Sequence, residues 1–345
     1  MKRRLLLLAI LGLVFVLALS TPADAQKKRF FGIATGGVGG VYYPVGGAIA
    51  TALTNTIPDM VVTAQTGNAS VANVNLIARG EVESGISQNN VALAAYTGDK
   101  ESWKTPPVKS LRCISALFPE TVHTLVLKKS GIKSVYDLKG KRLIVGDKGS
   151  GTEFDSRRFL EAIGLTYNDL QPIFVYYAAA VQRMQDEQAD GLFWTSGFPN
   201  ANMIEIATTK DVLFLPFPDE VIKKLNDKYP YYTPYTMPAN IYPKQNYPVK
   251  TIAIISLWVT RADIDEKTIY DITSHLYEKK PQIYREKKEL ASGAEMAAAA
   301  HEQGKNIKLE NALLGVTVPL HKGALKYYKE KGMQIPAHLI PPEAK

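Results

Sequence analysis

Two glycine-rich segments stand where backbone N–H groups can hold an anion. TGGVGG covers residues 35–40 and KGSGT covers residues 148–152, and each lies between an apolar run and a run with helical spacing. In an α/β sheet, ligands bind beyond the carboxyl ends of the strands, where helix starts offer unpaired N–H groups and a positive dipole end. The segments therefore predict capture of a small anion, and loops that only turn the chain are the alternative.

Hydroxyl and aromatic side chains accompany these helix starts. Ser150 and Glu153 have the spacing of a capping box, with Gly151 between them. A third helix start lies in TGNAS, residues 66–70, with the polar side chains Thr66, Asn68 and Ser70. Aromatic residues border the same loops and can wall a pocket; they are Tyr42, Tyr43, Tyr176, Tyr177 and Trp194.

The sequence offers little support for enzymatic chemistry. Neither glycine segment contains GK[ST] or the G-x-G-x-x-G spacing, so neither is a nucleotide-binding motif. Ser130 and Lys133 match the S-x-x-K pattern of penicillin-recognising acyl enzymes, but S-D-N and K-T-G do not occur. We predict a protein that is not an enzyme. An exported acyl-transfer enzyme that uses Ser130 or Ser150 is the alternative from another class.

The sequence also contains no motif for binding a metal ion or a nucleic acid, and none for a reactive cysteine. The five histidines have no metal-ligand spacing, and His301-Glu302 does not continue to a second histidine. The single cysteine, Cys113, lies in the apolar run LRCISALF, which predicts a buried and unreactive thiol. Nothing resembles an RNA- or DNA-reading motif. We therefore expect no metal, no cofactor and no nucleic-acid partner.

The first 25 residues have the layout of a cleavable secretory signal. A basic KRR at residues 2–4 precedes the apolar run 5–19, and ADA at residues 23–25 forms the exit, which predicts cleavage before Gln26. The apolar run is shorter than the ~18–20 residues of a membrane-spanning helix. Removing three basic residues and one acidic residue lowers the net charge from +8 to +6, which is compatible with an anionic ligand. We expect an exported, periplasmic monomer.

With 345 residues, of which 46% are hydrophobic, the chain is long enough for about two globular domains. Strand-like and helical runs alternate from residue 29 onward, which is typical of parallel, helix-covered sheets. The strand-like runs are 29–35, 60–65, 84–88, 111–118, 122–128, 141–147, 172–177, 190–195, 211–217 and 251–260.

The pattern restarts after residue 130, which predicts two similar halves. IATGGVGG (33–40) in the first half has a similar counterpart, IVGDKGSGT (144–152), in the second half. Five prolines and six tyrosines in residues 229–248 exclude a helix there and predict an extended connection. The strand 251–260 is then expected to return to the first sheet. This predicts one lobe of 26–119 plus 247–345 and a second lobe of 120–246.

Five segments of the mature chain, in order, resemble the TAXI solute-binding proteins of the tripartite ATP-independent periplasmic (TRAP) transporters. These segments are TGGVGGVYYPVGGAIA, TGNASVANVNLIARGEVESGISQNNVA, DLKGKRLIVGDKGSGTE, LWVTRADID and LENALLGVTVPLHKGALKYYKEKG. The resemblance implies an α/β fold of the two-lobed periplasmic binding protein class (type II-like), with two mainly parallel sheets covered by helices and a hinge between them. It also implies a small carboxylate ligand, such as a glutamate-like amino acid or a dicarboxylate, delivered to the membrane subunits of a TRAP permease driven by an ion gradient.

The combined reading predicts a site built from both lobes. The expected ligand-binding residues are Gly39, Gly40, Tyr42, Ser70, Gln88, Ser150, Gly151, Thr152, Tyr177 and Ser196. Ser84 and Asn90 stand where members of the family often have acidic residues, and a neutral side chain at Asn90 would ease the entry of an anion. Arg157, one turn into the helix after KGSGT, is an alternative partner for a carboxylate. A receptor for an ABC importer of similar fold is the alternative within the same class.

Overall fold

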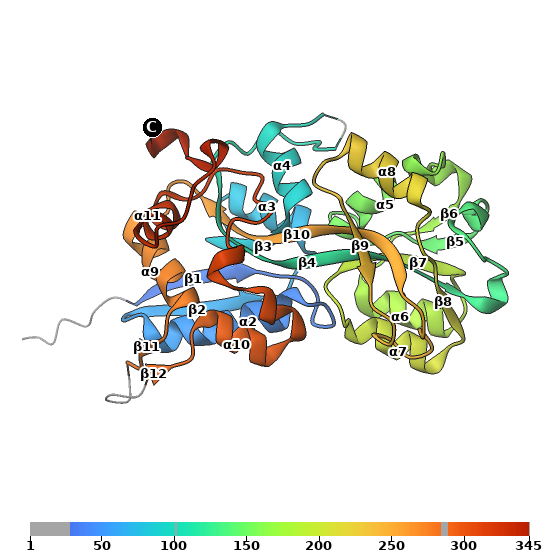
Figure 1. The fold of residues 1–345 in the computed structure, drawn as a ribbon, viewed down its shortest axis with the longest axis horizontal. Helices are drawn as coiled ribbons and strands as arrows, with labels where there is room; N and C mark the ends of the chain where they lie inside the picture. Colours follow the sequence, from blue (N-terminus) through green and yellow to red (C-terminus); the bar gives the residue numbers. More distant parts are fainter. Residues whose placement is uncertain (1–27, 101, 284–288, 345) are drawn as a thin grey trace, which may run out of the picture.

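The computed structural model describes residues 28–100, 102–283 and 289–344. The predicted signal, residues 1–25, and its cleavage site before Gln26 lie outside these residues. Within the described ranges no helix has the length and apolar character needed to cross a membrane. Strands and helices alternate through most of the chain, as the sequence predicts (Figure 1).

Ten strands form the main sheet. They are β1 (Arg29–Ala34), β2 (Met60–Gln65), β3 (Ser84–Gln88), β4 (Leu111–Leu127), β5 (Arg142–Ile144), β6 (Gln171–Ile173), β7 (Gly191–Ser196), β8 (Val212–Phe214), β9 (Thr233–Met237) and β10 (Val249–Arg261). Beside them, β11 (Lys280–Pro281) and β12 (Glu289–Leu290) form a separate two-stranded sheet. The helices are α2 (Tyr42–Thr56), α3 (Ser70–Ala78), α4 (Asn89–Thr97), α5 (Gly151–Ala162), α6 (Tyr177–Gln185), α7 (Ala201–Thr209), α8 (Asp219–Lys228), α9 (Glu266–Tyr277), α10 (Gly293–Ala300) and α11 (Lys322–Glu330).

The sheet is continuous, which corrects the prediction of two separate sheets. Its order is β2-β1-β3-β10-β4-β7-β5-β6, with β8 beside β4 and β9 beside β10. The pairs of β1 with β2 and β3, and of β5 with β6 and β7, are parallel as expected. The central pairs of β10 with β3 and β4, and of β4 with β7, are antiparallel. The sheet is therefore mixed, because β4 and β10 run from one end of the molecule into the other.

Strand β4 replaces two strands predicted at 111–118 and 122–128. It has 17 residues, and at ~3.3 Å per residue it spans roughly 55 Å. Pro119 has no N–H to donate, and it lies opposite Ile255, where the register between β4 and β10 shifts before Leu257. The proline interrupts the hydrogen-bond ladder at this irregularity without ending the strand.

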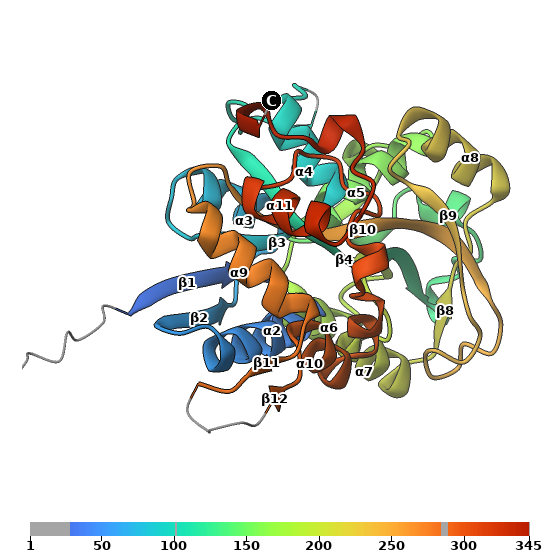
Figure 2. The same cartoon turned by 60° about the vertical axis from the view of Figure 1, so that its left-hand side comes forward.

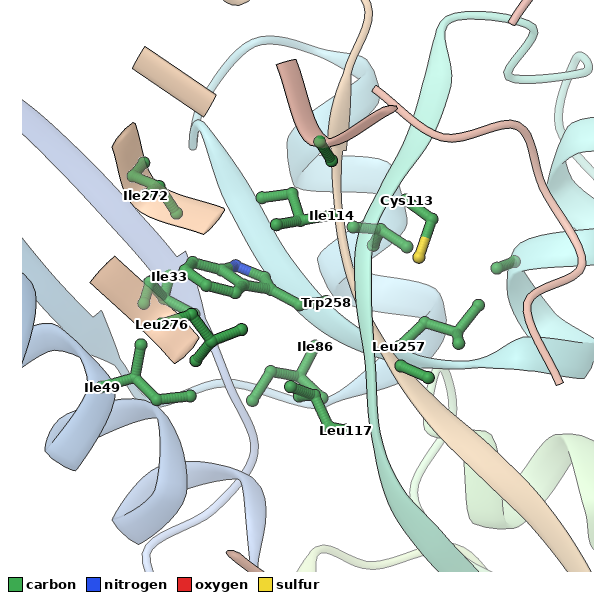
Figure 3. Close-up of a cluster of buried hydrophobic side chains, with 14 of the residues drawn as sticks. Ile33, Ile49, Ile86, Cys113, Ile114, Leu117, Leu257, Trp258, Ile272 and Leu276 are labelled. Atoms are coloured by element: carbon green, nitrogen blue, oxygen red, sulfur yellow. The ribbon is translucent and has the colours of Figure 1, made fainter. Parts of the chain in front are cut away.

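The apolar core divides into two lobes. One cluster of buried side chains joins β1–β3, the first half of β4, the second half of β10 and helices α2–α4 and α9–α11, and we call this part lobe one. In it, Trp258 lies among Ile33, Ile86 and Leu276, and Cys113 is enclosed nearby (Figure 3). Burial raises the pKa of the Cys113 thiol, so the prediction of a buried, unreactive cysteine agrees with its surroundings.

Lobe two contains β5–β9, the second half of β4 and the first half of β10, with a cluster on each face of its sheet. Val122 and Val126 of β4 belong to the cluster that includes residues of α5 and α8, whereas Leu125 and Leu127 belong to the cluster that includes residues of α6 and α7. This alternation follows the two-residue period of a strand. The helices accordingly lie above and below the sheet in Figure 1.

The chain leaves lobe two within β10. Ile252 and Ile254 belong to a lobe-two cluster, and Leu257 belongs to that of lobe one. The Pro/Tyr-rich stretch 229–248 contains β9, which pairs with β10 inside lobe two. After β10, helices α9, α10 and α11 pack on lobe one (Figure 2).

Candidate ligand-binding site

A small, enclosed cavity lies between the lobes, and we call it the inner cavity. Eight of the ten predicted binding residues line it, namely Gly40, Tyr42, Ser70, Gln88, Gly151, Thr152, Tyr177 and Ser196. Gly36, Val41, Ala69, Glu120, Thr195 and Gly197 complete its wall. Its volume is about 10 Å³, close to the minimum for one water molecule.

A second, larger cavity adjoins the first, and we call it the outer cavity. It measures about 430 Å³ and is lined by the other two predicted residues, Gly39 and Ser150. Thr66 and Asn68 of the third helix start also line it. Ala69 and Tyr177 belong to both walls, so they separate the two spaces.

Five helices begin at the inner cavity. Its wall contains the first residue or the N-cap residue of α2, α3, α4, α5 and α6. Of these five helices, as the structure describes them, only α5 has a side-chain cap, since Ser150 Oγ accepts a hydrogen bond from Glu153 N at 3.1 Å. Four uncapped helix starts and their dipoles direct positive potential toward one place.

The predicted capping box at Ser150 is only half formed. The Glu153 carboxylate does not return to Ser150; it accepts a hydrogen bond from the Tyr167 hydroxyl at 3.0 Å and pairs with Arg157 at 3.0 Å. Arg157 therefore forms an ion pair with Glu153, one turn away on α5, and it lines neither cavity.

Ser70 orders the lobe-one wall. It is the first residue of α3, and Ala69 before it has φ 61° and ψ −145°. Ser70 Oγ accepts a hydrogen bond from Gln88 N at 3.1 Å and lies 3.4 Å from the Tyr42 hydroxyl. Ser70 thus joins the starts of three helices.

Glu120 of β4 adds a carboxyl group that the sequence analysis did not select. It is 2% exposed, and the Tyr42 hydroxyl donates a hydrogen bond to its Oε1 at 2.5 Å. Burial raises the pKa of Glu120 to about 8, although hydrogen bonds from Tyr42 and Gln88 lower it. A lone acidic residue inside the apolar stretch 111–127 was the available signal, because such a side chain is either paired or functional.

Tyr177 lines the lobe-two side of the inner cavity, and its stacking partner Trp194 lines neither cavity. Tyr177 stacks on Trp194 with ring centroids 4.0 Å apart and an interplanar angle of 24°. A Cβ on Gly40 would lie 3.0 Å from the Tyr177 ring, so the glycine lets the ring approach the loop closely. The sequence analysis identified these aromatics from their position beside the loops.

Asn90 lies at the lobe interface outside both cavity walls. Its Nδ2 donates to Asp155 Oδ1 at 2.6 Å, and the Tyr232 hydroxyl donates to the same oxygen at 2.5 Å. Because Asn90 belongs to lobe one and the other two residues to lobe two, we call this group the interlobe contact. The other noted position, Ser84, accepts a hydrogen bond from Trp258 Nε1 at 3.0 Å in the core of lobe one.

The geometry does not assemble an acyl-transfer centre at Ser130. This residue closes a short 3-10 helix, Lys128–Ser130, and its hydroxyl donates to Leu127 O at 2.6 Å. Its carbonyl oxygen accepts from Lys141. In the described ranges, no group of histidine, cysteine and acidic residues is arranged to hold a metal ion.

The sequence of this chain was compared with models of known protein families. Residues 33–332 match the NMT1-like family, which is most of the chain and includes every residue of both cavity walls. The protein belongs to the NMT1-like family.

Several solved structures resemble this NMT1-like protein at low identity. The periplasmic aliphatic sulphonate binding protein SsuA from Escherichia coli is 16% identical, with 88% of this chain and 79% of that chain covered and a TM-score of 0.47. The alkanesulfonate-binding protein SsuA from Xanthomonas axonopodis pv. citri bound to MOPS is 15% identical, with 92% and 98% covered and a TM-score of 0.46. The sugar acid binding protein DctPAm from Advenella mimigardefordensis in complex with galactonate is 11% identical, with 89% and 86% covered and a TM-score of 0.42.

Proposed function

We propose that this protein is an exported solute receptor that captures a small carboxylate between its lobes. The observation that carries the proposal is the convergence of four uncapped helix starts, from both lobes, on one enclosed cavity. Backbone N–H groups and the hydroxyls of Ser70, Thr152 and Ser196 would bind the carboxylate oxygens. Glycines 40 and 151 let the backbone approach it, and Tyr42 and Tyr177 enclose it.

Closure of the lobes is part of this proposal. The inner cavity is smaller than any organic acid, so ligand entry requires the lobes to separate along the cavity. The two strands β4 and β10 cross between the lobes, and the register shift beside Pro119 lies where they cross. We propose that these strands carry the hinge, and that the lobes correspond broadly to the predicted ranges of 26–119 plus 247–345 and 120–246.

The proposed partners are the membrane subunits of a TRAP permease. The resemblance of five segments to TAXI proteins supports this partner over an ATP-driven importer. An ABC importer would use the same cavity in the same way, so the cavity does not discriminate between them. Uptake of the ligand by membrane vesicles containing the permease should follow an imposed ion gradient and should not require ATP.

Thermal unfolding tests whether the site binds its ligand through a carboxylate group. At a ligand concentration of ~100 times Kd, binding should contribute roughly 2.7 kcal/mol of stabilisation. This corresponds to a rise in Tm of several degrees, since ~1 kcal/mol shifts Tm by about 2–4 °C at 150–250 residues. Across a panel of small acids, the free acid should raise Tm and its methyl ester should not. Equal shifts from acids and esters would show that the helix starts do not bind a carboxylate.

A further inference from the structure

Glu120 places an acidic group in a cavity that otherwise favours anions. Its Oε1 accepts the hydrogen bond from Tyr42, and its side chain reaches the inner cavity from β4. No lysine, arginine or histidine lines either cavity described above. An ionised Glu120 therefore has hydrogen-bond donors beside it but no cation to pair with.

A second acceptor faces the same space. Gln88 is 2% exposed, and its Oε1 is buried without a hydrogen-bond partner among the described residues. A buried amide oxygen without a donor costs free energy, which a ligand that brings an N–H group would recover. Gln88 and Glu120 line the same small cavity, and the nearby Gln88 amide lowers the pKa of Glu120, so one donor group can reach both side chains.

An ammonium group satisfies both acceptors, because it carries a positive charge and three N–H donors. A neutral hydroxyl brings one donor and no positive charge, and a second carboxylate brings no donor for Gln88 Oε1. The uncapped helix starts in the same wall suit the carboxylate of the same ligand.

We propose that Glu120 and Gln88 select, among small carboxylates, those that also carry an ammonium group, and that Glu120 releases its proton when such a ligand binds. This inference rests on the proposed capture of a carboxylate. The O–H bond of Glu120 breaks, its proton passes to solvent, and the ammonium keeps its own protons and pairs with the carboxylate that remains.

The titration behaviour of Glu120 supports this exchange. The pKa of Glu120 is raised to about 8, mainly by burial, so at pH 7 the group is protonated. The ionisable groups facing it are Tyr42, Tyr177 and Asp155, and burial raises the pKa of each. A nearby ammonium favours the ionised carboxylate and lowers the pKa of Glu120. Because the bound state then holds fewer protons, affinity should rise with pH up to about 8.

Matched ligands test the selection. Each common L-amino acid is compared with its deaminated analogue, for example L-glutamate with glutarate, by isothermal calorimetry. For the ligand pair that binds, the wild-type protein should prefer the amino acid by roughly tenfold to a hundredfold. Glu120→Gln should abolish this preference and retain the melting behaviour of the unliganded protein. Glu310→Gln makes the same chemical change at an exposed position outside both cavities and should retain the preference.

Proton release gives a readout that needs no variant. The binding enthalpy of the wild-type protein at pH 7, measured in buffers of different ionisation enthalpy, should report release of most of one proton per ligand. Proton uptake would overturn the inference, and so would deaminated acids that bind as tightly as amino acids; in both cases carboxylate capture stands. Binding of no acid of either kind would overturn the proposed function as well.

Discussion

Gly151 of lobe two and Gln88 of lobe one meet so closely that no side chain fits between them. A Cβ on Gly151 would lie 2.2 Å from Gln88 Oε1. Gly151 is the first residue of α5 and Gln88 is the N-cap residue of α4, so the contact joins two helix starts across the cavity. The glycine therefore sets how far the lobes can approach.

Gly151→Ala should weaken ligand binding about tenfold, equal to ~1.4 kcal/mol, because the new methyl group displaces the Gln88 amide or holds the lobes apart. The far end of Gln88 can move, so we expect the Tm of the unliganded protein to change by no more than ~4 °C. Gly47→Ala is the matched control: nothing lies within 4 Å of its Cβ, and alanine should stabilise α2 by roughly 0.5–1 kcal/mol. Titration of both variants with the best acid of the panel measures the difference, and equal affinities would contradict the steric role of Gly151.

Asn90→Asp should destabilise the interlobe contact at neutral pH. The substitution places a carboxylate where Asn90 Nδ2 now lies 2.6 Å from Asp155 Oδ1, and two carboxylates at that distance cannot both ionise. We expect a loss of about 1–3 kcal/mol at pH 7.

The loss should shrink as the pH falls. The pKa of the acid pair in the folded protein is raised above the unfolded value of ~3.9, so the penalty exists at high pH and disappears as the pair takes up a proton. Thermal melts of wild type and variant between pH 4 and 8 measure the difference. Asn168→Asp, at an exposed position, serves as control, and a difference that does not depend on pH would contradict the shared-proton interpretation.

His123 should make the fold sensitive to acid. Its Nδ1 lies 3.1 Å from both Thr121 O and Trp194 O, its Nε2 lies 3.1 Å from the Tyr242 hydroxyl, and burial lowers its pKa to about 4. The unfolded chain binds a proton near pH 6.5 and the folded chain does not, so stability falls as the pH drops from ~6.5 to ~4. Lowering the pKa of His123 from ~6.5 to about 4 corresponds to roughly 3 kcal/mol of unfolding free energy that is lost across this pH range.

Urea unfolding of wild type and His123→Gln at several pH values tests this contribution. The stability of the variant should depend less steeply on pH between ~4 and ~6.5. Burial also lowers the pKa of His275 and His321 to about 4, so part of the dependence should persist in the variant. Parallel curves for the two proteins would show that His123 is protonated without cost in the folded state.

Ligand should make the protein more compact. Because the proposed hinge lies where β4 and β10 cross between the lobes, closure should reduce the radius of gyration without loss of secondary structure. Small-angle scattering with and without the acid that gives the largest rise in Tm measures this. An unchanged curve at saturation would refute hinge closure but not binding.

The exported protein should begin at Gln26. The basic residues 2–4, the apolar run 5–19 and the ADA exit predict this cleavage. Intact-mass measurement of protein from the periplasmic fraction checks it. A mass that retains residues 1–25, or recovery only with membranes, would contradict the prediction.

The sequence by itself determined much of the local structure and most of the residues that line the inner cavity. Strands 60–65 and 84–88 have the predicted bounds, and Gly80 follows α3 with φ 71°, the left-handed conformation that glycine commonly adopts after a helix. These features depend on hydrophobic period and on conformational preferences of single residues, which neighbouring residues in the chain are enough to reveal.

Only the tertiary structure decided how β4 and β10 join the lobes and which polar groups meet between them. The irregular pairing beside Pro119 lets one strand continue where the sequence predicts two. Glu120 faces the cavity and Asn90 faces Asp155, yet both stand in runs that look ordinary along the chain. Their partners lie 78 residues away for Tyr42 and 65 residues away for Asp155. Such contacts arise from the packing of one lobe against the other, so no local pattern in the sequence specifies them.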